Sequence, residues 1–98
     1  MSDYSVYILC CADQTYYTGI ATNVERRLQE HRDGRRGAKY LRGRAPLRLV
    51  FSAPVGDRSD ASRAEYRIKR LSRQEKQRLI DGELQLQDLL SGYKLATS

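Results

Sequence analysis

Two short β-forming segments stand at the start of the sequence and constrain every fold that the chain can adopt. Residues 4–11 (YSVYILCC) and 16–21 (YYTGIA) are rich in β-branched and aromatic side chains, which favour strands. Only the sequence ADQT separates the two segments, and a connection that short predicts a β-hairpin. The rest of the chain therefore has to pack against this hairpin.

A helix and a basic loop are predicted directly after the hairpin. Thr22 followed three residues later by Glu25 has the form of a capping box, which predicts a helix over residues 23–32. Gly34 is expected to end this helix. Residues 35–46 are rich in glycine and arginine, so we expect a binding loop there with at most one helical turn, around residues 38–41.

The second half of the chain predicts one strand and then helices. Apolar residues alternate over residues 47–51, which predicts a third strand that Pro54, Gly56 and the residues around them terminate. A second helix is then expected with Ser59 or Asp60 as its cap. Its apolar stripe consists of Ala61, Ala64, Ile68 and Leu71. Further helical segments are expected over residues 73–80, broken at Gly82, and over residues 84–90.

The order strand, strand, helix, strand, helix, helix predicts an α/β fold of the α+β type. We expect a small three-stranded, mainly antiparallel sheet flanked by helices. The 98 residues fit one domain, because chains usually divide only above about 250 residues. The prediction is a single domain over residues 1–90 followed by a flexible C-terminal tail over residues 91–98.

Composition excludes several classes of protein. No segment approaches the roughly 20 apolar residues that cross a bilayer, and the N-terminus lacks the basic start and cleavage site of a signal peptide. We therefore expect a cytoplasmic protein with no membrane partner. The cysteines, Cys10 and Cys11, are adjacent on a predicted strand, and the chain has one histidine. This argues against a disulfide framework and against a structural zinc site.

The formal net charge of +6 is concentrated in one quarter of the sequence. Between Arg26 and Arg48 lie nine basic residues and two acidic ones, whereas the other residues include nine basic and ten acidic side chains. Arginine outnumbers lysine eight to one in this segment, which suits bidentate contacts with phosphates. A solvated basic surface with no partner is the alternative. The residues expected to contact a nucleic-acid backbone are Arg26, Arg35, Arg36, Lys39, Arg42 and Arg44.

Two polar side chains share the inner face of the first predicted helix. Val24 and Leu28 define the apolar stripe, and Arg27 and His31 lie on the same face because residues three or four positions apart are neighbours. The structural interpretation places both residues at the edge of the stripe with solvated heads. The functional interpretation is a phosphate-binding site beside the basic loop.

Glu65 lies at the border of the apolar stripe of the second helix, next to Ala64. Burying an unpaired carboxylate is costly, so Glu65 is expected to pair with a cation. Lys69, four residues on, offers an ion pair, which is the structural interpretation. The functional interpretation makes Glu65 a magnesium ligand, and the spacing alone supports both.

These residues together resemble a known family. Ser5-Val6-Tyr7, followed by Tyr17-Thr18-Gly19, resembles the paired half-motifs of the GIY-YIG nucleases. The resemblance continues through residues 23–28, His31 and residues 61–69, and it covers about residues 4–82. The segment GAKYLRGRAPLRLVF is similar to the compact, stand-alone YhbQ-like bacterial members of that superfamily.

The resemblance implies a set of catalytic roles. It assigns Tyr7 and Tyr17 to the activation of water, Arg27 to the phosphate, and His31 to assistance of the base. It also makes Glu65 the only protein ligand of one Mg²⁺ or Mn²⁺ ion. Magnesium commonly takes one or two carboxylates and fills its octahedron with water and phosphate oxygens. Gly19 would allow a close approach of backbone or substrate, as glycine often does within a strand.

The sequence departs from the family pattern at three positions. Ser5 replaces the first glycine, Thr18 replaces isoleucine, and Ile20 stands where many members have lysine. If that lysine activates the base or binds phosphate, this chain has to use His31 or Lys39 in its place, or be slow. Gln77 is a candidate for the polar residue that some members have beyond the glutamate.

We therefore expect a metal-dependent endonuclease that acts on DNA, with RNA as the second candidate. The alternative is a nucleic-acid-binding module that keeps the fold but has little or no catalytic activity. A third hypothesis is an interaction protein whose basic face docks an acidic partner. Because a domain this small has little surface for a long recognition site, specificity is expected to be low or to come from a protein partner.

Overall fold

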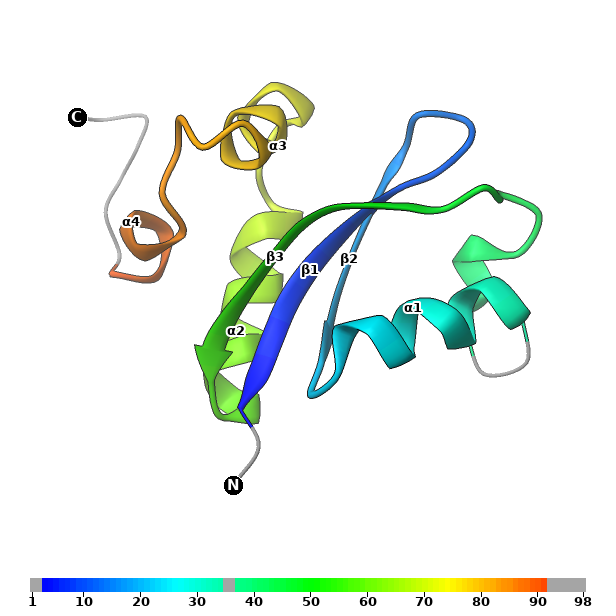
Figure 1. The fold of residues 1–98 in the computed structure, drawn as a ribbon. Helices are drawn as coiled ribbons and strands as arrows, with labels where there is room; N and C mark the ends of the chain where they lie inside the picture. Colours follow the sequence, from blue (N-terminus) through cyan, green and yellow to red (C-terminus); the bar gives the residue numbers. More distant parts are fainter. Residues whose placement is uncertain (1–2, 35–36, 92–98) are drawn as a thin grey trace.

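The predicted hairpin supplies the central strand and one edge strand of the sheet. A computed structural model describes residues 3–34 and 37–91. β1 (Tyr4–Cys10) pairs antiparallel with β2 (Tyr16–Ala21) on one side and with β3 (Arg48–Gly56) on the other, in the order β2-β1-β3. Figure 1 shows these three strands crossing the middle of the molecule. β2 and β3 are thus the edge strands of the sheet.

The third strand is longer than expected. β3 continues through Pro54 and ends at Gly56, so the strand ends within the expected segment, residues 54–57, but Pro54 itself does not terminate it. Pro54 lies opposite Ser5 in the antiparallel register. Proline is tolerated there because the outer side of an edge strand has no partner that requires an N–H donor.

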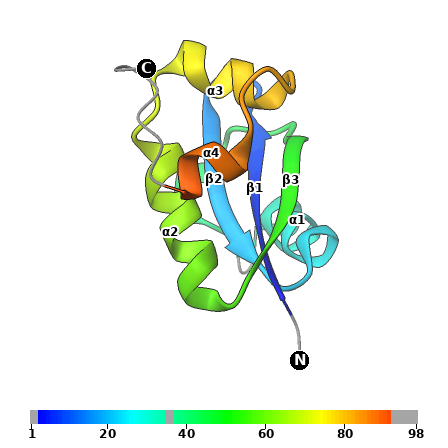
Figure 2. The same cartoon turned by 90° about the vertical axis from the view of Figure 1, so that its left-hand side faces the viewer.

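Helices cover both faces of the sheet. The structure contains α1 (Val24–Asp33), the single 3₁₀ turn η1 (Lys39–Leu41), α2 (Arg58–Lys69), α3 (Arg73–Ile80) and α4 (Leu86–Leu90). α1 lies on one side of the sheet, and α2, α3 and α4 lie on the other (Figures 1 and 2). The predicted α+β class, with a three-stranded antiparallel sheet flanked by helices, is confirmed.

Two helix caps differ from the predicted ones. The capping box expected at Thr22 does not form; Asn23 caps α1 instead, and its side-chain oxygen accepts a hydrogen bond from the backbone N–H of Arg26. Asp57, and not Ser59 or Asp60, caps α2, and it forms a reciprocal capping box with Asp60. Both regions contain several good capping residues in a row, so local sequence alone does not choose among them.

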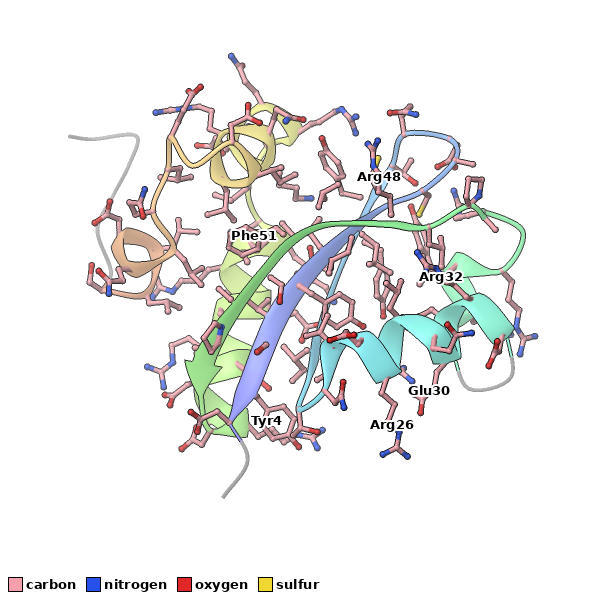
Figure 3. All side chains as sticks on the ribbon, in the orientation of Figure 1. Tyr4, Arg26, Glu30, Arg32, Arg48 and Phe51 are labelled. Atoms are coloured by element: carbon pink, nitrogen blue, oxygen red, sulfur yellow. The ribbon has the colours of Figure 1, made fainter. Side chains whose placement is uncertain are left out.

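The central strand supplies side chains to two separate cores. Val6 and Ile8 point to the side of α2, α3 and α4, where they pack with Ile68 and Leu79. On that same side lies Phe51 (Figure 3). The side chains of β1 that point the other way, including Tyr7, pack with residues of α1 and η1. Alternation along β1 thus fills a core on each face of the sheet.

Some expectations fall outside this description. The expected tail lies almost entirely at residues 92–98, and Arg35 and Arg36 lie in the gap of the basic loop; all are outside the described residues. Within the described ranges, none of the helices is long and apolar enough to cross a membrane. Cys10 and Cys11 are both buried and carry free thiols.

Candidate active site

Tyr7 is the side chain around which the site is built. It is 1% exposed and lies on β1 directly opposite Gly19 of β2. A Cβ atom at Gly19 would stand 2.6 Å from the hydroxyl oxygen of Tyr7 and 2.7 Å from its Cζ atom. Only glycine leaves room for the phenol at this point, so the close approach at Gly19 is made by the ring of Tyr7.

His31 is held from both sides by its neighbours. It is 5% exposed on the inner face of α1, so the interpretation that its head is solvated is wrong. Its Nδ1 atom accepts a hydrogen bond of 3.0 Å from the backbone N–H of Ala38. In neutral imidazole the other nitrogen then carries the proton, so Nε2–H donates to the Tyr7 hydroxyl oxygen, 2.8 Å away.

Burial sets the protonation of this pair. It lowers the pKa of His31 below its usual value, and the charge of Arg27 lowers it further. Burial also raises the pKa of Tyr7 to about 12; the nearby Tyr17 adds to that rise, whereas Arg27 opposes it. At neutral pH His31 is therefore an uncharged donor, and Tyr7 is a protonated phenol.

Arg27 brings a permanent positive charge to the phenol. Its guanidinium hydrogen-bonds the Tyr7 side chain, and its Nη1 atom donates to Oε1 of Glu30 at 2.9 Å. Glu30 also pairs with Arg26 at 3.5 Å. Figure 3 shows the side chain of Arg26 extending away from the sheet. Sequence reasoning missed Glu30, although its position three residues after Arg27 on a helix is a recognisable signal.

A polar hollow lies beside the side chain of Arg27. Its volume is about 230 Å³, and it is lined by the end of β2, the start of α1 and the side chains of Arg26, Arg27 and Glu30. The side chain of Arg27 is 32% exposed. An anion that enters this hollow can thus reach a guanidinium that already contacts Tyr7.

Tyr17 extends the cluster along β2. Its ring centroid lies 6.5 Å from that of Tyr7 and 5.5 Å from that of His31, which it meets edge-on. It also stacks on Tyr40 of η1, with centroids 6.0 Å apart and an interplanar angle of 22°. The two tyrosines of the half-motifs therefore share one aromatic cluster with His31.

Glu65 approaches the cluster from α2. Its Oε2 atom pairs with Nζ of Lys69 at 3.0 Å, and the Glu65 side chain is 25% exposed. Its negative charge contributes to the raised pKa of Tyr7. The ion pair with Lys69, which the structural interpretation expected, therefore forms. The carboxylate is also close enough to the Tyr7 phenol to affect its pKa. Within residues 3–34 and 37–91, no three His, Cys, Asp or Glu side chains gather in a way that could hold a metal.

The expected phosphate-binding residues have different surroundings. Lys39 and Arg42 are exposed in and after η1. Arg44 is engaged by other side chains, because it pairs with Asp13 of the turn between β1 and β2 and lies 4.2 Å above the ring of Tyr40.

Two residues that bear on the family pattern face the other side of the sheet. Ile20, at the position where many members have lysine, packs against the core beneath α2. Gln77 of α3 accepts a hydrogen bond from the hydroxyl of Tyr16. Neither side chain belongs to the group around Tyr7 and His31.

Comparison with known proteins identifies the family. The model of the GIY-YIG catalytic domain matches residues 3–78. A UPF0213 protein YhbQ from Escherichia coli is 53% identical over 94 residues, which are 96% of this chain and 93% of that protein. A UPF0213 protein from Cronobacter sakazakii is 50% identical over 91 residues, covering 93% of this chain and 95% of the relative.

Solved structures agree with these relatives. The solution NMR structure of a UPF0213 protein from Bacillus halodurans is 41% identical, has a TM-score of 0.54, and covers 98% of this chain and 99% of that one. The solution NMR structure of a protein from E. faecalis is 39% identical, has a TM-score of 0.56, and covers 87% of this chain and 90% of that one. The family model and these relatives together show that this chain belongs to the GIY-YIG family, a family of nucleases, and is similar to its small UPF0213 YhbQ proteins.

Proposed function

We propose that this chain is a metal-dependent nuclease that hydrolyses phosphodiester bonds in DNA, with RNA as the second candidate substrate. The observation that carries the proposal is the buried phenol of Tyr7, whose oxygen receives hydrogen bonds from His31 and Arg27. A catalytic base needs its deprotonated form stabilised and its orientation fixed, and two donors directed at one phenolic oxygen supply both.

Tyr7 is the proposed general base, with Tyr17 beside it. The phenolate oxygen of Tyr7 would take a proton from water while that water attacks phosphorus, and the bond from phosphorus to the leaving oxygen would break. Because burial raises the pKa of Tyr7 to about 12, the phenolate depends on positive charge nearby. His31, held in the Nε2–H form by Ala38, stabilises the phenolate as a donor and does not itself accept the proton.

Arg27 is proposed to bind the phosphate that is cut. Its pKa is raised above the usual value, first by the hydrogen bond to Glu30, so the guanidinium stays charged. With Glu30 holding Nη1, the partly exposed guanidinium is oriented towards the hollow at the start of α1. A positioned guanidinium there would offset the charge that develops on the phosphate oxygens in the transition state.

Glu65 is proposed to hold one Mg²⁺ or Mn²⁺ ion. Its oxygen donors suit these ions, and a carboxylate that is 25% exposed leaves space for the waters that magnesium usually keeps. A bound ion would supply Lewis-acid stabilisation of the phosphate and the leaving oxygen. When the ion binds, Lys69 would have to weaken its ion pair with Glu65 and contact the substrate instead.

The same ion pair favours a second candidate function. A carboxylate neutralised by Lys69 at 3.0 Å is compatible with a module that binds nucleic acid through its basic segments and cuts it slowly or not at all. The family fold is then retained for binding.

Cleavage assays distinguish the two candidates. Labelled single-stranded, duplex and branched DNA and RNA are incubated with the wild type, Glu65→Gln or Glu83→Gln, with Mg²⁺ or with chelator. Glu83 is a suitable control because it is an exposed carboxylate that also pairs with a basic side chain. The nuclease proposal predicts cleavage only with Mg²⁺ and a loss of about 100-fold, or about 3 kcal/mol, in Glu65→Gln alone. Equal cleavage by all three proteins, or none by the wild type, would refute it.

A further inference from the structure

A groove opens beside the proposed catalytic residues Tyr7, His31 and Glu65. The GIY-YIG half-motifs do not account for it. Its volume is about 350 Å³, and its lining residues are Tyr16, Tyr17, Thr18, Tyr40, Lys69 and Lys76. Two of them contact the candidate active site, because Tyr17 lies against Tyr7 and His31, and Lys69 pairs with Glu65. The groove therefore borders the proposed catalytic residues at the start of β2, whereas the hollow beside Arg27 lies at the end of that strand.

Aromatic rings stand on two sides of this groove. Tyr17 and Tyr40 stack on each other on the side of η1, and Tyr16 stands on the side of α3, where its hydroxyl donates to Gln77. Tyr40 is 44% exposed, so part of its ring is open to solvent. Each of the outer rings carries an arginine: Arg44 lies 4.2 Å above Tyr40, and Arg73 lies 4.5 Å above Tyr16.

Positive charge lines the same groove. Among the described residues, Lys76 makes no ion pair, and the Lys69 side chain is 54% exposed. The segment from Arg58 to Lys76, which covers α2 and the first half of α3, contains seven basic and three acidic residues. Acidic residues outside this segment offset its positive charge in the net charge of the chain. The net charge therefore does not reveal this second basic surface.

Rings beside cations match the chemistry of an unpaired nucleotide. Bases of single strands stack on aromatic side chains, and lysines neutralise the adjoining phosphates. In a duplex, the neighbouring bases cover both faces of each base. A base in a duplex therefore cannot stack on the tyrosine rings of the groove. The volume lies near the lower end of pockets that hold small molecules, which suits one nucleotide.

We infer that this groove is a subsite for an unpaired nucleotide next to the phosphodiester that is cut, with Tyr40 and Tyr17 contacting the base and Lys76 its phosphate. The inference rests on the proposed function and adds a substrate class to it. A strand that is single, frayed or branched enters the site, and an uninterrupted duplex does not.

Binding measured in chelator tests the subsite independently of cleavage. The ligands are a short labelled oligothymidylate, an abasic oligomer of the same length, and a duplex of the same length. The variants are Tyr40→Leu, Tyr40→Phe and Lys76→Gln. The matched controls are Tyr66→Leu, because Tyr66 is also exposed and lies near an arginine, Arg70, and Arg78→Gln, which changes a charge on the same helix as Lys76.

The subsite predicts a specific pattern of affinities. Tyr40→Leu weakens binding of the oligothymidylate about fivefold or more, Tyr40→Phe and Tyr66→Leu bind like the wild type, and the abasic oligomer shows no difference between wild type and Tyr40→Leu. Lys76→Gln lowers the slope of log affinity against log salt by about 0.7, and Arg78→Gln leaves it unchanged.

Three results would overturn the inference: equal losses in Tyr40→Leu and Tyr66→Leu, an equal loss with the abasic oligomer, or equal affinity for the duplex and the single strand. The proposed function fails separately, when this binding pattern is present but the wild type cuts nothing in Mg²⁺.

Discussion

The two ring nitrogens of His31 have fixed and different partners. Nδ1 accepts from the backbone of Ala38, and Nε2 faces the hydroxyl oxygen of Tyr7. Adding a proton would destroy the acceptor at Nδ1, which agrees with the lowered pKa of this histidine. At the scale of single residues, therefore, His31 is a positioning residue for Tyr7, and Tyr7 is the group whose ionisation should control the rate.

The pH dependence of cleavage distinguishes these roles. The base form of Tyr7 becomes more abundant as pH rises, because burial raises its pKa to about 12. We expect kcat/KM to rise with pH above about pH 7, by up to about tenfold per unit. If His31 were the base, its lowered pKa would make the rate level above about pH 6.5. A plateau that begins there would contradict the assignment of Tyr7.

Sequence patterns identified some site residues and not others. Arg27, His31 and Glu65 were found because charged or polar groups stood on helix faces that periodicity assigns to the core. Glycine at position 37 gave no such signal, although a Cβ atom there would lie 2.6 Å from Cα and 3.0 Å from Nδ1 of His31. That contact joins residues on either side of a loop and depends on tertiary structure.

At the scale of elements, the two residues directly before η1, Gly37 and Ala38, position the ring of His31. A methyl group at position 37 would press on backbone atoms of α1, which cannot move aside cheaply. We expect Gly37→Ala to displace Ala38, break its hydrogen bond to Nδ1 and lower cleavage. The ¹⁵N chemical shifts of the His31 ring report its tautomer directly, and they should change from the Nε2–H form towards a mixture.

Gly34→Ala is the control for this prediction. Gly34 caps α1 with φ of 78°, and a Cβ atom there would have no neighbour within 4 Å. The change should cost about 1 kcal/mol of stability through backbone strain and leave the tautomer unaltered. A Gly37→Ala protein with the wild-type tautomer and wild-type activity would show that Gly37 and Ala38 do not position His31.

Element boundaries were predictable where one local signal dominated. The helix predicted over residues 73–80 agrees with α3, which begins at a capping box between Ser72 and Glu75. The predicted starts of α1 and α2 differ from the observed ones because each region holds more than one good capping residue, and the local sequence does not choose between them. The sequence places the end of β3 within residues 54–57. It does not show that Pro54 belongs to the strand, because a position at the sheet edge, which tolerates proline, is not visible in the sequence.

At the scale of the whole molecule, two basic segments flank the edge strand β2. One runs through α1 and η1, and the other through α2 and α3, with Tyr17 of β2 between them. The positive charge of the first segment is evident in the sequence. The positive charge of the second is offset by acidic residues when charge is averaged over the chain. Only the fold places both beside one group of side chains, namely Tyr7, His31 and Glu65.

The central claim is that Tyr7 of β1 and Glu65 of α2 act in one hydrolytic site. Single-turnover cleavage of a labelled oligonucleotide by the wild type, Tyr7→Phe, Glu65→Gln and the double variant tests it most directly. The prediction is a loss of about 100-fold or more in each single variant, and a double variant no slower than the slower single one, because residues that act as a unit are not additive. Losses that multiply in the double variant, or a single variant as fast as the wild type, would contradict the claim.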